Sequence, residues 1–172
     1  YRKKEKLITG LKKRLWRDFY RITCGFTGAP LMLPVLLDNG MTDIAYRMLL
    51  TEEFPGWLYA VNLGATTIWE RWNSIRPDGS FNPANMNSLN HYSYGSVVEF
   101  LYRYAAGISP TAPGFRKAKI APLPEIRLGS MECRFDSASG TYVSNWRIEP
   151  DGSLSFHIEI PFDCEAEVRL PE

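Results

Sequence analysis

The sequence predicts an α+β protein in which a helical part precedes a small antiparallel β part. Two observations predict this division. Apolar residues recur at helical spacing as far as Ala106. After Gly107 prolines become frequent, and short segments then alternate apolar with polar residues, as strands with one buried face do. We therefore expect two domains, 1–107 and 108–172.

The helical part contains several segments whose apolar residues form one inward-facing stripe. Helices are predicted at about 2–20, 31–37, 42–52, 57–61 and 93–106. Gly40 suits the left-handed position that ends the second of these helices, and Pro55 breaks the chain before the fourth. The loop between the last two helices is rich in Asn, Pro and Gly.

The β part is predicted from alternation and from turn residues. Strands are expected at 131–136, 140–149, 153–160 and 165–170. Ser139-Gly140 and Asp151-Gly152 are typical of hairpin turns. We therefore expect antiparallel pairing of neighbouring strands.

Composition limits the classes of partner. The 172 residues carry a formal net charge of +1, so no strong overall field attracts nucleic acid or an anionic membrane. The basic segment 2–17 also carries helically spaced apolar residues, which indicates a solvated helix face. The longest apolar run, 30–37, is too short to cross a bilayer. We expect no nucleic-acid partner and no membrane partner.

The three cysteines do not suggest a metal site. Cys24, Cys133 and Cys164 are far apart, and no Cys/His spacing typical of zinc ligands occurs. Cys133 and Cys164 either face one another in the β part or remain separate buried thiols. We expect neither a metal nor another cofactor.

Two islands concentrate polar and aromatic side chains. They are residues 64–72 (GATTIWERW) and 90–95 (NHYSYG), and they supply Glu70, Arg71 and His91. A sugar pocket needs aromatic faces for pyranose C–H groups, directional partners for hydroxyls and carboxylates for glycosidic cleavage. The islands therefore predict a carbohydrate site, and a single chain reversal could bring His91 back to Glu70 on one concave surface.

Each polar candidate also has a structural interpretation. Thr67 and Glu70 fit a capping box at a helix start, in which Glu70 would bond only to backbone. In the alternative, Glu70 is an ionised carboxylate aimed at a water molecule. His91 is either a structural residue or, as a neutral imidazole, a donor and acceptor for a sugar hydroxyl.

The aromatic candidates are ambiguous in the same way. Trp69 and Trp72 would share one face of a helical turn, and most such pairs are core packing. We expect at least one of them beside the sugar. Trp69, Trp72, Arg71 and Tyr92 are therefore the candidate sugar-binding residues that accompany His91.

These islands, with the turn at 78–81 (DGSF), resemble the C-terminal catalytic region of bacterial α-L-rhamnosidases, which form glycoside hydrolase family 78. The resemblance continues through 27–30 (TGAP), 55–59 (PGWLY), 99–103 (EFLYR) and the closing strands, so it covers nearly the whole chain. Two departures are mild, since Asn73 stands where Asp is common and Ser74 where Gly is common.

The resemblance implies that 1–107 is the C-terminal portion of an (α/α)6 toroid and that 108–172 is a small antiparallel β-sandwich. It implies an inverting enzyme that releases terminal α-linked L-rhamnose from a glycoside or oligosaccharide, with Glu70 as general base and His91 contacting the sugar. The general acid of such enzymes lies upstream and is missing here. Because the chain also begins without Met, we expect a fragment that is inactive alone.

Two other functions stay open from the residues themselves, namely a carbohydrate-binding module without catalysis and a toroid-fold scaffold without a ligand. Edge helices are expected to leave apolar residues such as Leu11 and Leu15 exposed, which predicts self-association. No signal or transmembrane segment is evident, so we expect a soluble protein. The compartment stays open between the cytoplasm and the periplasm for the parent enzyme.

Overall fold

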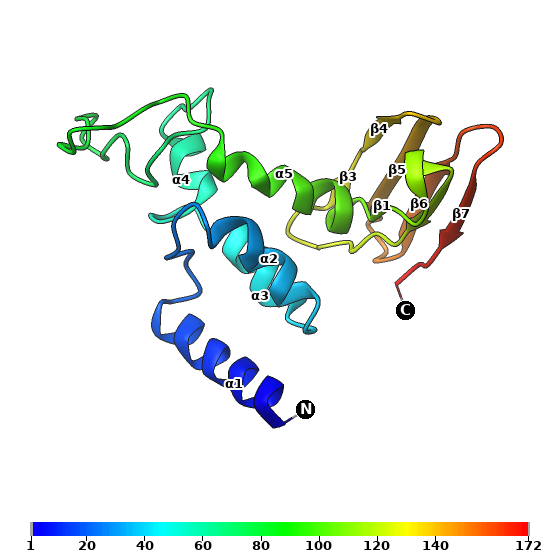
Figure 1. Ribbon diagram of the computed structural model, residues 1–172, viewed down its shortest axis with the longest axis horizontal. Coiled ribbons are helices and arrows are strands. Elements are labelled where there is room, and N and C mark those ends of the chain that lie inside the picture. The colour runs from blue at the N-terminus through cyan, green and yellow to red at the C-terminus, as the bar shows by residue number, and fades with distance from the viewer. Residues whose placement is uncertain (1, 172) are drawn as a thin grey trace. The chain divides into compact units, whose positions relative to one another are not determined.

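The computed structural model describes residues 2–171 and contains two compact units, which divide between Val97 and Val98. The first unit is helical, and every strand of the described residues lies in the second, as the colours of Figure 1 show. The predicted α+β class is confirmed. This division of the fold falls inside the last helical run, ahead of Gly107, and the domain boundary at Gly107 stays a prediction.

The first unit contains the predicted helices with small changes at their ends. They are α1 (Arg2–Arg17), α2 (Ala29–Leu37), α3 (Thr42–Leu49) and α4 (Trp57–Asn62). Helix α2 packs against α3 (Figure 1). The core of this unit includes the fully buried side chains of Ile22, Leu33, Leu36, Tyr46 and Met48.

Helix α1 ends three residues before the predicted limit at residue 20, because the chain there turns left-handed. Phe19 and Tyr20 have φ values of 54° and 60°, and a left-handed residue ends a helix. The backbone N–H of Tyr20 donates to the carbonyl oxygen of Leu15 at 2.7 Å.

The exposure expected for α1 is partly wrong. Leu15 is buried, with 3% of its surface exposed, at the turn that brings the backbone of Tyr20 back to it. Leu11 is half-buried. Leu7 and Trp16 are exposed instead, so self-association of this helix stays a prediction that now rests on those two side chains.

The last helical run spans 93–105 without a break but changes its winding. It consists of a 3-10 turn (Ser93–Ser96), α5 (Val97–Phe100) and a π-helical turn (Leu101–Ala105). The backbone N–H of Ala106 donates to the carbonyl oxygen of Leu101 at 2.8 Å. Gly107 then leads into the strands.

The second unit holds two sheets. Their strands are β1 (Ile108–Pro110), β2 (Lys117–Ile120), β3 (Ser130–Met131), β4 (Arg134–Ser137), β5 (Gly140–Ile148), β6 (Leu154–Glu159) and β7 (Glu165–Val168). The order is β1-β2-β7 in one sheet, while β5 is central in the other. Strands β3 and β4 lie along one side of β5, and β6 pairs with it as well.

The segment predicted as one strand at 131–136 is divided because a side chain enters the ladder. The backbone N–H of Cys133 donates to the side-chain oxygen of Asn145 at 2.9 Å. The carbonyl oxygen of Cys133 still accepts from the N–H of Ser144 at 3.0 Å. Strands β3 and β4 therefore keep a common register with β5 on either side of this point.

One pair departs from the antiparallel pattern. Strand β7 pairs parallel with β2, in a register that sets Lys117 opposite Glu165, and their side chains form an ion pair at 2.8 Å. Sequence alternation marks β7 as a strand but carries no information about a partner so far away in the chain. Strands β1 and β2 lie outside the predicted strands.

The N-terminal end of the second unit is tied to β5 through buried hydrogen bonds. The Ser144 hydroxyl donates to the carbonyl oxygen of Ala106 at 2.7 Å, and the Trp146 indole N–H donates to that of Ala105 at 2.8 Å. Gly107 follows with φ at 78°, and its carbonyl oxygen accepts from the N–H of Ala121 at 3.0 Å. A Cβ on Gly107 would lie 2.2 Å from backbone atoms of Ala121 and Pro122.

We predict that Gly107→Ala destabilises the second unit severely, since the methyl group meets rigid backbone as well as an unfavourable φ. Gly129→Ala is the matched control, because Gly129 has a φ of 74° with open space around its Cα. Urea unfolding should show a loss of about 1–2 kcal/mol for the control and several kcal/mol for Gly107→Ala. Equal losses would contradict the proposed clash.

Candidate active site

Backbone hydrogen bonds bring the two sequence islands together. The N–H of Glu70 donates to the carbonyl oxygen of Ser88 at 2.9 Å, and the N–H of His91 donates to that of Ile68 at 2.8 Å. The hydroxyl of Thr67 donates to the carbonyl oxygen of Leu89. The chain reversal inferred from the sequence therefore sets residues 67–70 beside 88–91.

Glu70 is fixed by the same pairing. One carboxylate oxygen, Oε2, accepts from the backbone N–H of Ser88 at 2.7 Å. The capping-box interpretation is wrong, because residues 67–72 form no helix and Thr67 bonds to Leu89 instead. The idea that Trp69 and Trp72 share a helical face fails for the same reason.

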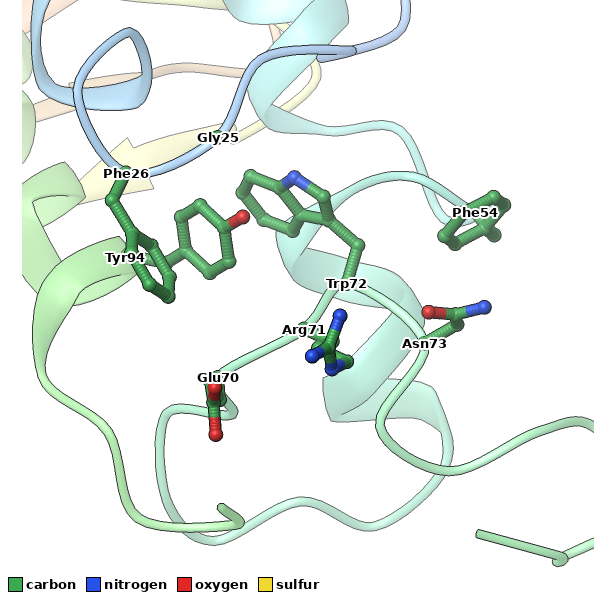
Figure 2. A pocket seen from close by; sticks show the side chains of 8 residues that line it. All are labelled: Gly25, Phe26, Phe54, Glu70, Arg71, Trp72, Asn73 and Tyr94. Atoms are coloured by element: carbon green, nitrogen blue, oxygen red, sulfur yellow. The ribbon is translucent and has the colours of Figure 1, made fainter. Parts of the chain in front are cut away.

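A cleft of about 360 Å³ opens beside Glu70. Four consecutive residues of one loop, 70–73, supply one part of its lining (Figure 2). The other lining residues come from distant segments, and they are Gly25, Phe26, Phe54 and Tyr94. Of these, only Tyr94 belongs to one of the two sequence islands.

Stacked rings make the aromatic wall of the cleft. The ring of Trp72 lies on that of Tyr94 with centroids 3.7 Å apart and planes at 22°. Phe26 contacts Tyr94 at 5.1 Å, and the edge of the cluster continues to Trp57, 5.2 Å from Trp72. The Trp72 indole N–H donates to the carbonyl oxygen of Cys24 at 3.0 Å, and the Trp57 indole N–H donates to that of Tyr94 at 2.9 Å. The wall is therefore built from rings in fixed positions.

His91 lies next to this wall. Its imidazole stacks on Phe26 with centroids 4.6 Å apart and planes at 12°. The backbone N–H of Ser93 donates to Nδ1 at 3.4 Å, an arrangement that leaves the ring proton on Nε2. Phe26 lines the cleft while His91 does not, so one ring separates the imidazole from it.

The remaining candidates differ in exposure. Trp69 is buried and does not line the cleft, whereas Trp72 does. Tyr92 stacks on His91 at 5.5 Å but has 87% of its surface exposed. Arg71 lines the cleft, and its Nε donates to the carbonyl oxygen of Met86 at 3.1 Å. Of the aromatic candidates, Trp72 alone faces the described cleft.

Hydrogen bonds from polar side chains hold the loop that carries residues 70–73. The side-chain oxygen of Asn73 accepts from the amide of Asn82 at 2.9 Å, and the amide of Asn87 donates to the carbonyl oxygen of Ser74 at 2.9 Å. Asp78, the other carboxylate of this region, accepts from the backbone N–H and the hydroxyl of Ser80 at 2.9 and 2.6 Å. Asp78 is therefore occupied in a turn, as its sequence context predicts.

Burial changes the proton affinity of two groups at the wall. Burial raises the pKa of the Tyr94 phenol above its ordinary value, and the nearby Cys24 raises this pKa further. Burial raises the pKa of the Cys24 thiol as well. Both groups therefore stay neutral near pH 7 and add no negative charge to this region.

Among the described residues no cluster of His, Cys, Asp and Glu could hold a metal ion. Cys24, Cys133 and Cys164 are free thiols, and Cys133 and Cys164 both belong to the core of the second unit or pack against it. No helix within 2–171 is long and apolar enough to cross a membrane.

Two family models match the chain in succession. Residues 2–105 match the bacterial α-L-rhamnosidase six-hairpin glycosidase domain, and residues 107–172 match the bacterial α-L-rhamnosidase C-terminal domain. An α-L-rhamnosidase of Streptomyces avermitilis is 40% identical over 167 residues, which is 97% of this chain. One from an Alteromonas species is 43% identical over 147 residues, or 86% of the chain. In both cases the chain spans only 16% of the relative's length.

Solved structures agree with these matches. The Streptomyces avermitilis α-L-rhamnosidase, crystallised with L-rhamnose, superposes with a TM-score of 0.87 at 41% identity, covering 92% of this chain and 15% of that one. The native enzyme from Aspergillus terreus gives a TM-score of 0.86 at 37% identity, covering 92% and 18%. The resemblance drawn from the two islands is thereby confirmed, and the chain belongs to the bacterial α-L-rhamnosidase family, of which it comprises part of the six-hairpin glycosidase domain and the C-terminal domain.

Proposed function

We propose that this chain is part of an inverting α-L-rhamnosidase that releases terminal α-linked L-rhamnose from glycosides, and that Glu70 is its general base. The observation that carries the proposal is the placement of Glu70, which lines an aromatic-walled cleft and has one carboxylate oxygen held by the N–H of Ser88. The second oxygen, Oε1, is the atom assigned to the attacking water.

The reaction follows from this geometry. In an inverting hydrolysis one carboxylate takes a proton from water on one face of the sugar, while a carboxylic acid protonates the leaving oxygen on the other. The two carboxyl groups stand about 6.5–9.5 Å apart to leave room for the water. Glu70 is the one carboxylate among the described residues lining the cleft, and we assign the acid to a part of the parent enzyme outside this chain.

The neighbouring residues supply binding. Phe26, which is 40% exposed, and the half-buried Trp72 offer aromatic surface to the C–H face of a pyranose, while Tyr94 is buried and supports Trp72 by stacking on it. His91 stacks on Phe26 and does not line this cleft, so the hydroxyl that we assign to its Nε2–H belongs to a part of the substrate that extends past Phe26. Arg71, which also lines the cleft, offers further N–H groups.

The two alternative functions are less well supported. A scaffold role would leave Glu70 bonded only within its own turn, whereas its carboxylate reaches Ser88 at a cleft. A binding role without cleavage uses the same aromatic wall and is the function expected of the isolated chain.

In the full-length parent, we predict that Glu70→Gln lowers kcat about a hundredfold or more while rhamnose affinity changes little. The amide keeps the shape and can still accept from the Ser88 N–H, but it cannot take a proton. Steady-state kinetics with an aryl α-L-rhamnoside measures both parameters. Asp78→Asn is the matched control, because Asp78 serves a turn, and it should stay near the wild-type rate. Near-wild-type turnover by Glu70→Gln would refute the assignment of Glu70 as the general base.

The stereochemistry of the hydrolysis product provides a second test of the proposed mechanism in the parent enzyme. Proton NMR early in the hydrolysis should show β-L-rhamnose as the first anomer, as inversion requires. Azide is already an anionic nucleophile, so it needs no general base. When it is added to the Glu70→Ala variant of the parent, it should restore turnover and give β-L-rhamnosyl azide. An α-configured first product would exclude inversion.

His91→Ala in the parent should weaken substrate binding and rate together, by about 1–3 kcal/mol for the loss of a buried hydrogen-bond partner. The measured quantities are kcat/KM and the dissociation constant of L-rhamnose. His157→Ala is the control, since His157 is exposed on β6 and pairs with Glu159 at 2.8 Å. Unchanged binding by His91→Ala would remove this residue from the sugar site.

The isolated 172-residue chain should show negligible hydrolysis of an aryl α-L-rhamnoside, because positioned proton transfer from a missing acid is worth about 10²–10⁴-fold. The assay compares chromophore release by this chain with that by the parent at equal molarity, after circular dichroism has verified the fold. Turnover comparable to the parent would mean that the acid lies within the chain, and Asp78 would then be tested first.

A further inference from the structure

The second unit contains a cleft that the rhamnosidase site does not use. It measures about 450 Å³, within the range of small-molecule sites. Its lining comes from the end of the helical run, from β1 and β4, and from the loop before β2. The residues that matter for its chemistry are Glu99, Tyr102, Arg103, Ser109, Phe115 and Phe135.

Three rings form a concave aromatic corner in this cleft. The ring of Tyr102 meets that of Phe135 edge-on, with centroids 5.7 Å apart and planes at 66°. Phe115 lies 4.7 Å from Phe135 at 44°. Tyr102 has 37% of its surface exposed, so the corner remains accessible from solvent.

Phe115 is held there at a cost in backbone strain. Its φ of 61° is one that bulky side chains rarely adopt, and it follows Gly114 at 67°. Two hydrogen bonds hold this pair of left-handed residues. Tyr142 donates its hydroxyl to the carbonyl oxygen of Phe115 at 2.6 Å, and Ser139 donates to that of Gly114 at 2.7 Å. Such strain persists only where its surroundings enforce it, and it is concentrated at ligand sites.

Part of Phe115 serves the core, since it packs against the buried cluster that includes Tyr142. Packing alone does not account for the remaining surface of the ring, which lines the cleft beside Phe135. The strained loop therefore fixes a ring that packs partly against the core and partly lines the cleft.

The polar groups of the cleft favour an uncharged ligand. Arg103 donates to Glu99 at 3.0 Å, and each side chain remains about half exposed, at 53% and 55%. Because the two opposite charges are paired, these side chains give the cleft no net charge that would select an anion or a cation. A ligand with neutral hydroxyl groups can donate to the carboxylate and accept from the guanidinium, and the Ser109 hydroxyl can do either.

We propose that this cleft binds a pyranose carbohydrate, with the apolar ring face of the sugar against Tyr102 and Phe135 and its hydroxyls toward Glu99, Arg103 and Ser109. An apolar face combined with neutral donors and acceptors is the chemistry of a pyranose. This second sugar site is separate from Glu70 in sequence and does not depend on the proposed hydrolysis.

The test is a titration of the isotope-labelled 172-residue chain with methyl β-D-glucopyranoside and, separately, methyl α-L-rhamnopyranoside, followed by NMR. At least one should give saturable shifts at the amides of Ser109 and Phe115 and at the ring of Tyr102. Glycerol, a polyol without a ring face, should give none. Because the shifts are assigned to residues, binding here is distinguished from binding at Trp72 or His91.

Tyr102→Ala should weaken this binding roughly five- to tenfold, the effect of one lost aromatic contact. Tyr102→Phe keeps the ring and should bind nearly as the wild type. Phe162→Ala is the surface control, because Phe162 is 93% exposed and lies outside the cleft. If Tyr102→Ala does not fold, Ser109→Ala and Glu99→Gln supply the same comparison at the polar side.

Three results would overturn the proposal. One is the absence of saturable shifts at these residues with either glycoside. Another is equal binding by the wild type and all cleft variants. The third is a shift of the same resonances with protein concentration alone, which would mean that a second copy of the chain covers the cleft.

Discussion

The hydrogen bonds that join residues 67–70 to 88–91 are the constraint on which the candidate site depends. They tie two segments separated by a long polar loop, and one of them ends on the catalytic candidate itself, from Ser88 N–H to the carboxylate of Glu70. A carboxylate held by a backbone donor cannot swing freely among rotamers. The Ser88 N–H therefore fixes the carboxylate of the residue that we propose as the general base.

The same pairing also positions the aromatic side of the site. It sets His91 where Phe26 can stack on it, and Tyr94 follows close behind to lie on Trp72. Phe26 reaches this place from a loop that precedes α2. Because Trp72 and Tyr94 stack on each other, the positions of both rings are fixed before any ligand binds.

In the second unit as well, a few hydrogen bonds hold together segments that are distant in the chain. Buried bonds from Ser144 and Trp146 attach β5 to the carbonyl groups at Ala105 and Ala106, and the left-handed Gly107 lets the backbone pass close to Ala121. Tyr142 of the same strand holds the strained loop at Phe115. One strand therefore supports both the junction with the helical run and the aromatic corner of the second cleft.

The sequence by itself determined the helices, most strands and the two islands, because periodicity, turn residues and a specific motif are local properties of the chain. The tertiary structure alone decided how these segments pair and which side chains line the cleft. Residues 67–72 have the spacing of a helix start but pair across the loop, since the bonds to 88–91 satisfy their backbone instead. Leu15 is buried at a left-handed turn, β7 pairs parallel with β2, and Phe26 lines the cleft from far away. The pairing of β7 and the position of Phe26 depend on contacts between residues distant in the chain, which a single sequence does not specify. The burial of Leu15 depends on a left-handed turn that helical periodicity does not reveal.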